Sequence, residues 1–172
     1  LVQSLGDLAQ LDEPQFALRL ERLDVAELLD DIALRFAPRA AAQGVRLASE
    51  PALDEPVRAA LDIELFERAV ANLVDNALKF CPAGGRITLG ARRVDATVRV
   101  SVSDSGSGIA AADQPHLFDR FYQSRHGVAP ATGAGGKGLG LAIVKRIAEL
   151  HGGSVSVHSL PGQGTTVTLC LP

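Results

Sequence analysis

The chain has 172 residues, 47% of them hydrophobic, which is enough for one domain with a substantial core. The net charge is −3 and the lysines and arginines are scattered, so the sequence lacks the basic patch that a nucleic-acid-binding surface needs. No apolar run approaches the roughly 20 residues that a membrane-spanning helix requires.

The N-terminal residues are predicted to be the end of a longer helix. Leu1, Leu5 and Leu8 have the spacing of one helical seam, and the segment ends before Pro14. The chain begins with leucine rather than methionine. We therefore expect residues 1–12 to be the tail of a helix that starts outside this sequence.

Alternating apolar and polar residues over Phe16–Glu21 predict a strand. A capping-box pattern of Asp24 with Glu27 then opens a helix. Pro38 is expected to kink or end that helix, and Gly44 to close the segment.

A short strand is expected at Val45–Ser49, followed by a connection interrupted by prolines. Asp62 is the expected N-cap of the next helix. On that helix Asn72, Asn76 and Lys79 occupy positions i, i+4 and i+7, which share one face. The neighbouring face carries an apolar stripe formed by Phe66, Ala69, Val70, Leu73, Val74 and Ala77.

Two hairpins are predicted in the second half of the chain. Arg86–Arg93 pairs with Ala96–Ser103, and Ser154–Ser159 pairs with Thr165–Leu171. A helix over Leu141–Leu150 precedes the second hairpin. Three helices with hairpin strands imply an α+β fold, a two-layer sandwich. Residues 109–136 form too long and irregular a segment for a structural connection, so a functional lid is expected there.

The polar face of the Asn72 helix has the chemistry of a cation and phosphate site. Mg²⁺ prefers oxygen ligands and keeps several waters, so one amide oxygen with phosphate oxygens forms a reasonable shell. The alternative is an amphipathic helix whose amides face solvent. Taken alone, this stretch favours the alternative.

Asp104 ends a predicted strand and begins a turn. A carboxylate there can accept a hydrogen bond from the 6-amino group of adenine, and it would repel the carbonyl oxygen of guanine. Gly106 and Gly108 are expected to supply positive φ angles and close backbone approach. The alternative is an ordinary Asp-Gly turn.

Four motifs follow one another in a fixed order. They are Asn72–Phe80, Asp104–Gly108, Leu117–Tyr122 and Gly136–Leu141. In order and spacing they resemble the N, G1, F and G2 boxes of the ATP-binding catalytic domain of sensor histidine kinases, in the GHKL superfamily. The resemblance runs from about Phe16 to the C-terminus. It implies the Bergerat fold, with a mixed, mostly antiparallel sheet covered on one face by three helices and a flexible ATP lid.

The resemblance implies ATP and Mg²⁺ as ligands. Asn76 would ligate Mg²⁺, Lys79 would neutralise phosphate charge, and Asn72 would complete the polar wall. Ile109 is expected to close one side of the adenine site, while Phe80 either packs on the adenine face or belongs to the core.

The remaining motifs are expected to hold the lid and the phosphates. Phe118 and Phe121 would anchor the lid by burying their rings. Arg120 between them either reaches a phosphate or faces solvent. The other residues that the resemblance places at the nucleotide are Gly136, Lys137, Gly138, Leu139, Gly140, Leu141 and Thr165, with the phosphate contact of Lys137 left open. The amides at the start of the Leu141 helix suit phosphate oxygens.

The resemblance also separates phosphate transfer from hydrolysis. In the gyrase-type, mismatch-repair and chaperone ATPases of this superfamily, a glutamate four residues before the magnesium-binding asparagine activates water. Asn72 occupies that position here, and an amide cannot accept a proton near neutral pH. Phosphoryl transfer to a positioned side chain depends mainly on alignment and charge neutralisation.

The phosphoacceptor histidine of the family is expected before residue 1. His116, His126, His151 and His158 lack its sequence context, so this chain is expected to bind ATP without phosphorylating itself. The expected partners are the chain's own dimerisation domain and the receiver domain of a response regulator. The family further implies a monomeric fragment of a homodimeric parent, anchored at the cytoplasmic face of the bacterial inner membrane.

Two other functions stay open at this point. One is an anti-sigma-type serine kinase, against which the helical tail and Asn72 both argue. The other is a degenerate nucleotide-binding module that only regulates a partner, against which Asn76, Lys79 and Asp104 argue.

Overall fold

The computed structural model describes residues 2–51, 55–120, 122 and 139–172. Five strands form one sheet in the order β2-β4-β5-β7-β6, and two further strands, β1 and β3, pair separately. The strands are β1 (Glu21–Asp24), β2 (Arg46–Ser49), β3 (Arg58–Leu61), β4 (Arg86–Val94), β5 (Thr97–Asp104), β6 (Ser154–Ser159) and β7 (Thr165–Leu171). The helices are α1 (Val2–Leu11), α2 (Val25–Ala42), α3 (Ile63–Phe80) and α4 (Gly140–Leu150), with one 3-10 turn at Gln114–His116.

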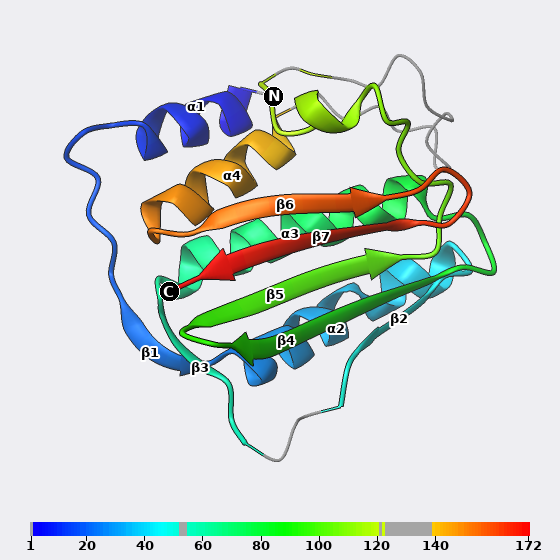
Figure 1. Ribbon diagram of the computed structural model, residues 1–172, viewed down its shortest axis with the longest axis horizontal. Coiled ribbons are helices and arrows are strands. Elements are labelled where there is room, and N and C mark those ends of the chain that lie inside the picture. Colours follow the sequence, from blue (N-terminus) through cyan, green and yellow to red (C-terminus); the bar gives the residue numbers. More distant parts are fainter. Residues whose placement is uncertain (1, 52–54, 121, 123–138) are drawn as a thin grey trace.

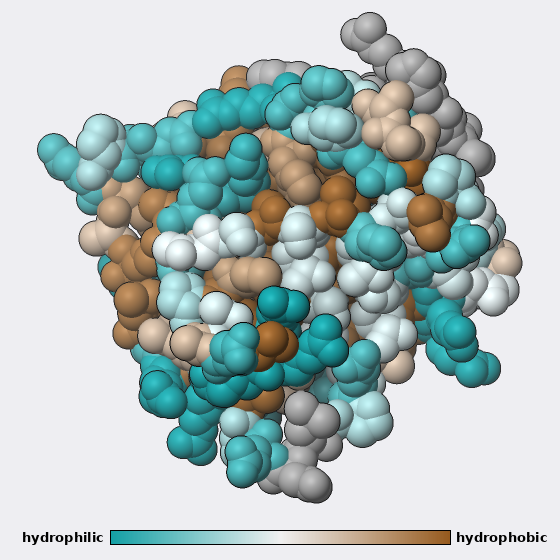
Figure 2. Space-filling model, viewed as in Figure 1, coloured by the Kyte–Doolittle hydropathy of each residue, from teal (hydrophilic) through white to brown (hydrophobic). Residues whose placement is uncertain are grey.

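The architecture is the predicted two-layer α+β sandwich. Strand β2 runs parallel to β4, whereas β4–β5, β5–β7 and β6–β7 are antiparallel. Helices α2, α3 and α4 cover one face of this sheet (Figure 1). No described helix covers the opposite face, which is mainly polar (Figure 2), because serines and threonines of β5 and β7 face outward there and alternate with inward-facing valines and leucines.

Helix α3 forms the centre of the core because its apolar stripe is continuous. Phe66, Val70 and Val74 are buried, as are the other predicted members of the stripe. Each such side chain stabilises the fold by about 1.5–3 kcal/mol when fully buried. Asp62 caps the helix as predicted, since its carboxylate accepts a hydrogen bond from the backbone N–H of Leu65 at 3.2 Å.

The strand predicted at Phe16–Glu21 is misplaced. The observed strand β1 begins at Glu21, because its antiparallel partner β3 pairs only with residues 21–24. The preceding residues are held differently: the backbone N–H of Arg19 donates to the Asp62 carboxylate at 3.1 Å. Alternation alone did not reveal β3, which lies in the proline-rich connection.

Helix α2 starts at the predicted cap, where the Asp24 carboxylate accepts from the backbone N–H of Glu27. Pro38 is expected from the sequence to kink or end this helix. It does not end the helix, because α2 continues to Ala42. Proline removes one hydrogen bond, here to the carbonyl of Leu34. Leu34 is 73% exposed, so the lost hydrogen bond lies on the solvent side of the helix. Gly44, with a φ of 72°, closes the segment as expected.

Helix α1 packs on α4 (Figure 1). Its residues Leu8 and Leu11 are buried, and Asp7 forms an ion pair with Arg68 of α3 at 3.8 Å. Among the described residues, no helix is both long and apolar enough to cross a membrane.

Candidate functional site

Asp104 and Asn76, which come from different predicted motifs, line one pocket. The pocket lies between α3 and the adjoining ends of β5 and β7, and Phe80, Ile109 and Thr165 also line it. The rest of its lining is apolar and buried and consists of Leu73, Ala77, Val102 and Val167. The sequence-predicted adenine contacts and the sequence-predicted cation ligand are therefore brought together at one place.

A second and larger cavity among the described residues lies elsewhere. It has a volume of about 150 Å³ and lies at the start of α2 and the ends of β2 and β3, where Asp24, Glu50 and Gly90 are among its lining residues. None of its lining residues belongs to the predicted motifs. The pocket at Asp104 encloses only about 10 Å³, roughly one water, yet it collects the convergent polar groups that mark a binding site.

Asp104 is the last residue of β5 and pairs with Thr165, the first residue of β7. One carboxylate oxygen accepts a hydrogen bond from the backbone N–H of Gly106 at 2.8 Å. Burial raises the pKa of this carboxyl, while the backbone N–H groups of Gly106 and Thr165 act in the opposite direction. Asp104 is thus a partly desolvated carboxylate facing a pocket.

Three glycines let backbone segments meet beside Asp104. A β-carbon on Gly164 would lie 2.1 Å from the Asp104 carbonyl oxygen, and one on Gly106 would lie 2.4 Å from the Phe80 carbonyl oxygen. Gly108 has a φ of 77°, as predicted. The expectation of a positive φ at Gly106 is wrong, because the φ angle of this described residue is not positive. Position 106 instead requires glycine because the Phe80 carbonyl oxygen leaves no room for a β-carbon.

Sequence reasoning missed two residues that fix Ile109. The backbone N–H of Ile109 donates to the Ser159 hydroxyl at 2.7 Å, and the Gln114 side-chain amide donates to the Ile109 carbonyl at 3.0 Å. The same Gln114 amide also donates to the Ser159 carbonyl at 3.0 Å. Ser159 in turn lies 2.8 Å from the Thr165 hydroxyl. In the sequence, only the position of Ser159 opposite Thr165 in the predicted hairpin could have indicated that Ser159 lies at the site.

The polar face of α3 has the predicted composition and a contact that was not predicted. The Asn72 side-chain amide donates to the Gly140 carbonyl at the start of α4, at 3.4 Å. Asn76 lies one turn further along and lines the pocket, whereas Lys79 lies in the last turn of α3 outside the pocket lining. Asn72 therefore connects the first motif to the last.

Among the described residues, no side chain caps the start of α4. Leu139 occupies the N-cap position and provides no side-chain hydrogen bond to the first backbone amides of the helix. Leu139 is buried and Leu141 packs partly against the core, so the helix start is held in place by apolar contacts. Gly136, Lys137 and Gly138 lie outside the described residues.

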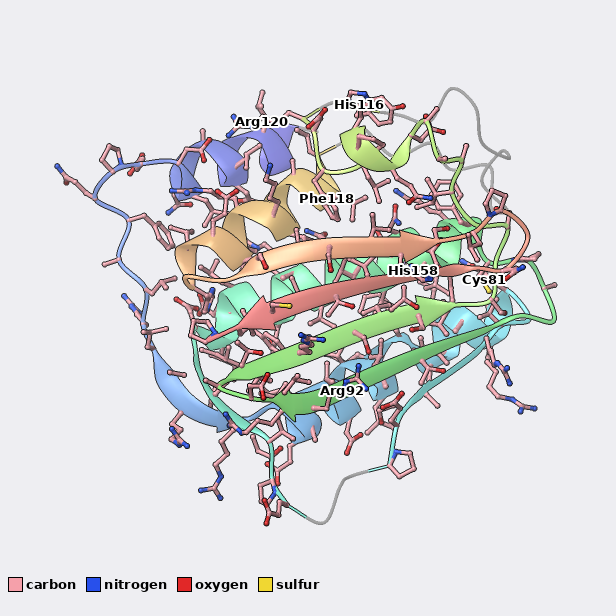
Figure 3. All side chains as sticks on the ribbon, in the orientation of Figure 1. Cys81, Arg92, His116, Phe118, Arg120 and His158 are labelled. Atoms are coloured by element: carbon pink, nitrogen blue, oxygen red, sulfur yellow. The ribbon has the colours of Figure 1, made fainter. Side chains whose placement is uncertain are left out.

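The predicted lid, residues 109–136, is described as far as residue 120 and at Tyr122. Phe118 packs against the core as predicted (Figure 3), whereas Phe121 lies outside the described residues. The sequence predicts that Arg120 either reaches a phosphate or faces solvent. In the structure its guanidinium is about half exposed and forms an ion pair with Asp12, the residue that follows α1.

The three described histidines occupy structural or exposed positions, as expected. His116 lies 3.1 Å from Asp119, His158 is exposed on β6, and His151 ends α4 (Figure 3 labels the first and second). His126 lies outside the described residues. Over the described part of the chain, no group of three histidine, cysteine, aspartate or glutamate side chains is arranged to hold a metal ion.

Comparison with known proteins gives the pocket a context. Residues 61–172 match the family of histidine kinase-, DNA gyrase B- and HSP90-like ATPases. This chain belongs to that family. Membership of this ATPase family supports ATP binding, and the matched range contains all four motifs.

The similar members of this ATPase family are sensor proteins and sensor kinases. The sensor protein DivL of Caulobacter vibrioides is 42% identical over 171 residues, which cover 99% of this chain and 21% of DivL. The sensor-like histidine kinase SenX3 of Mycobacterium tuberculosis is 35% identical over 172 residues, which cover 100% of this chain and 41% of SenX3. This chain thus spans well under half of these relatives, which favour the histidine-kinase prediction over a serine kinase.

The crystal structure of full-length ShkA in complex with AMPPNP has the same fold. Its TM-score is 0.87 at 31% identity, and the match covers 99% of this chain and 35% of ShkA. This likeness extends over α1 and the catalytic sandwich alike, because almost the whole of this chain is included.

Proposed function

We propose that this chain is the ATP-binding catalytic domain of a two-component sensor histidine kinase, which donates the γ-phosphate of ATP to a histidine outside this sequence. The single observation that supports it most is the pocket shared by Asp104 and Asn76. Family membership and the sensor-kinase relatives support the same proposal.

At the adenine end, the Asp104 carboxylate selects the base. It accepts a hydrogen bond from the 6-amino group, and a guanine carbonyl in that place would leave two acceptors facing each other. Phe80 and Ile109 line the pocket and supply apolar contacts to the ring. The pair Ser159 and Gln114 holds Ile109 in position.

At the phosphate end, Asn76 contributes an amide oxygen to Mg²⁺. Such a site fits this chain because Mg²⁺ bound to nucleotides keeps waters and phosphate oxygens as most of its ligands, so a cluster of carboxylates is not needed. Lys79 neutralises phosphate charge, and the backbone amides at the start of α4, which the N-cap side chain does not bind, hold phosphate oxygens. The metal when bound supplies charge neutralisation in phosphoryl transfer.

Transfer rather than hydrolysis follows from the side chain at position 72. Asn72 cannot act as a general base, and its amide is already used to hold the start of α4 through Gly140. Water in the site is therefore poorly activated, and a nucleophile presented by another domain receives the phosphate.

The remaining parts of the proposal concern the whole protein. Residues 1–12 are the end of the dimerisation helix, residues 16–172 are the catalytic domain, and residues 109–136 are the ATP lid. The parent protein is a homodimer at the cytoplasmic face of the inner membrane, and a response regulator receives the phosphate from its histidine.

The test combines this chain with Mg²⁺, radiolabelled ATP and a separate helical fragment that carries a phosphoacceptor histidine from the parent protein. Acid-labile label on the fragment, and none on this chain, is the expected result. An otherwise identical fragment with that histidine replaced by alanine is the matched control. Label on a serine, or ATP binding with no transfer at all, would contradict the proposal.

A further inference from the structure

The residue after α1 is bound to the predicted lid. The Arg120 guanidinium forms an ion pair with one carboxylate oxygen of Asp12, and the Arg146 Nε lies 3.2 Å from the other. Figure 3 shows Arg120 beside α1. A single carboxylate thus joins three elements: the end of α1, the segment before residue 121, and α4.

We propose that Asp12 competes with the phosphates of the nucleotide for Arg120, so that the docked position of α1 withholds a positive charge from the site. This inference rests on the proposed function. Carboxylates and phosphates are both good partners for the planar guanidinium fork, and one guanidinium cannot fully satisfy two such partners at different places.

Asp12 is well placed to act as this competitor because it is fixed independently of Arg120. The Arg146 Nε also donates to the Leu11 carbonyl at 3.1 Å, and another nitrogen of Arg146 lies 3.6 Å from Glu149. Leu11 itself is buried, as is Leu8 one turn earlier. Release of Arg120 therefore does not require Asp12 to move.

Movement of α1 would also break the contact between Asp12 and Arg120, so the position of α1 can regulate the site. If α1 rotates or shifts on α4, Asp12 moves with it and Arg120 loses its partner. In the proposed parent protein α1 continues into the dimerisation helix, so movement of that helix would change how readily Arg120 reaches the nucleotide. The Asp7–Arg68 pair ties α1 to α3 but does not involve Arg120.

The effect is expected to be modest. The side chains of Arg120 and Asp12 are 53% and 33% exposed, and such pairs are screened by solvent and salt. Asp12→Asn is expected to tighten ATP binding about two- to fivefold at low salt, the range that a surface ion pair supports. The gain should shrink as salt is added.

The experiment is a double-mutant cycle read by calorimetric titration with ATP-Mg²⁺. The variants are Asp12→Asn, Arg120→Ala and both together, with Asp7→Asn as the matched control that removes a charge from α1 without touching Arg120. The inference predicts tighter ATP binding for Asp12→Asn alone, no such gain when Arg120 is alanine, and unchanged binding of adenosine, which has no phosphate. Asp7→Asn should bind ATP like the unaltered chain.

Unchanged or weaker ATP binding in Asp12→Asn, or a gain that persists in the Arg120→Ala background, would overturn the competition while leaving the proposed function intact. A gain of the same size in Asp7→Asn would also overturn it, since a general loosening of α1 would then be the cause. Absence of ATP binding in the unaltered chain would overturn the proposed function itself.

Discussion

Asp104 and Thr165 face each other as paired residues of neighbouring antiparallel strands, β5 and β7. The pairing directs the backbone N–H of Thr165 toward the Asp104 carboxylate, and both residues line the pocket that contains Asn76. The backbone N–H of Gly106 donates to this carboxylate at 2.8 Å, so the carboxylate is held in position before a ligand donor arrives. This relationship gives base selection a structural cause.

The first prediction concerns Asp104→Asn. An amide can turn its NH₂ toward a guanine carbonyl, so the preference for ATP over GTP should fall by roughly ten- to a hundredfold, as expected for about 1–3 kcal/mol of unpaired polar interaction. Calorimetric titration with both nucleotides measures the ratio. Equal ATP and GTP binding by the unaltered chain would remove Asp104 from this role.

The second prediction concerns pH. Because burial raises the folded-state pKa of Asp104 above its ordinary value of 3.8, the folded protein holds this proton more tightly than the unfolded chain does. The stability that Asp104 contributes is therefore present below 3.8 and is lost as pH rises through the raised pKa. Unfolding free energies of the unaltered chain and Asp104→Asn, compared across this range, should diverge in favour of the variant as pH rises.

Nucleotide affinity should have the opposite pH dependence. The ionised carboxylate is the stronger acceptor for adenine, so ATP binding should weaken as pH falls through the raised pKa, and this weakening should be smaller in Asp104→Asn. Identical pH profiles for the two proteins would show that Asp104 does not contact the base.

The third prediction concerns Asn76→Ala. Loss of the amide oxygen should lower ATP affinity in the presence of Mg²⁺ by about tenfold or more, on the scale of a hydrogen bond to a charged group, but should change affinity little in the presence of a chelator. Circular dichroism should show an intact fold, because Asn76 is only partly buried. An equal loss with and without Mg²⁺ would argue against metal ligation.

The sequence predicted the fold well where local patterns determine it. The two hairpins, the caps at Asp24 and Asp62 and the buried stripe of α3 are all properties of short segments, and all are confirmed. One error arises where a distant partner decides. Strand β1 starts where β3 can pair with it. The end of α2 was missed for a different reason, because a proline within the helix did not end it before Ala42.

The fourth prediction uses the close contact at Gly106. In Gly106→Ala the new β-carbon would lie 2.4 Å from the Phe80 carbonyl oxygen, so either α3 or the turn after β5 must shift. We expect a loss of about 1–3 kcal/mol in unfolding free energy, with weaker ATP binding. Gly140→Ala is the stability control, because among the described residues no atom beyond its chain neighbours and its own helix backbone lies within 4 Å of the added carbon. Urea denaturation distinguishes the two, and equal stabilities would disprove the contact.

The fifth prediction concerns His151. Its Nε2 accepts from the backbone N–H of Asp62 at 3.1 Å, and its Nδ1 lies 2.8 Å from the Ile147 carbonyl, which together require the neutral ring with the proton on Nδ1. His151→Ala leaves the Asp62 N–H without this acceptor and should lower stability by about 1–3 kcal/mol.

The exposed His158 supplies the control for that variant, since His158→Ala should change stability by less than about 0.5 kcal/mol. Thermal unfolding of both variants checks the pair. If His151→Ala were as stable as His158→Ala, the hydrogen bond to Asp62 would not matter for the fold.

Parts of the candidate site were beyond sequence reasoning for a physical reason. The motifs indicated Asp104, Asn72 and Asn76 because their chemistry is visible in the residue types. The supports of the site are ordinary residues: a serine, a glutamine and an aspartate after α1. Only the tertiary structure shows that Ser159 and Gln114 hold Ile109, or that Asp12 holds Arg120.

The most direct test of the pocket is a nuclear magnetic resonance titration of the ¹⁵N-labelled chain with ATP-Mg²⁺. We expect the largest shifts at the backbone amides of Gly106 and Thr165 and at the side-chain amide of Asn76, and none at Gly90 in the larger cavity. Shifts centred on Gly90, with Gly106 and Asn76 unmoved, would contradict nucleotide binding in the pocket shared by Asp104 and Asn76.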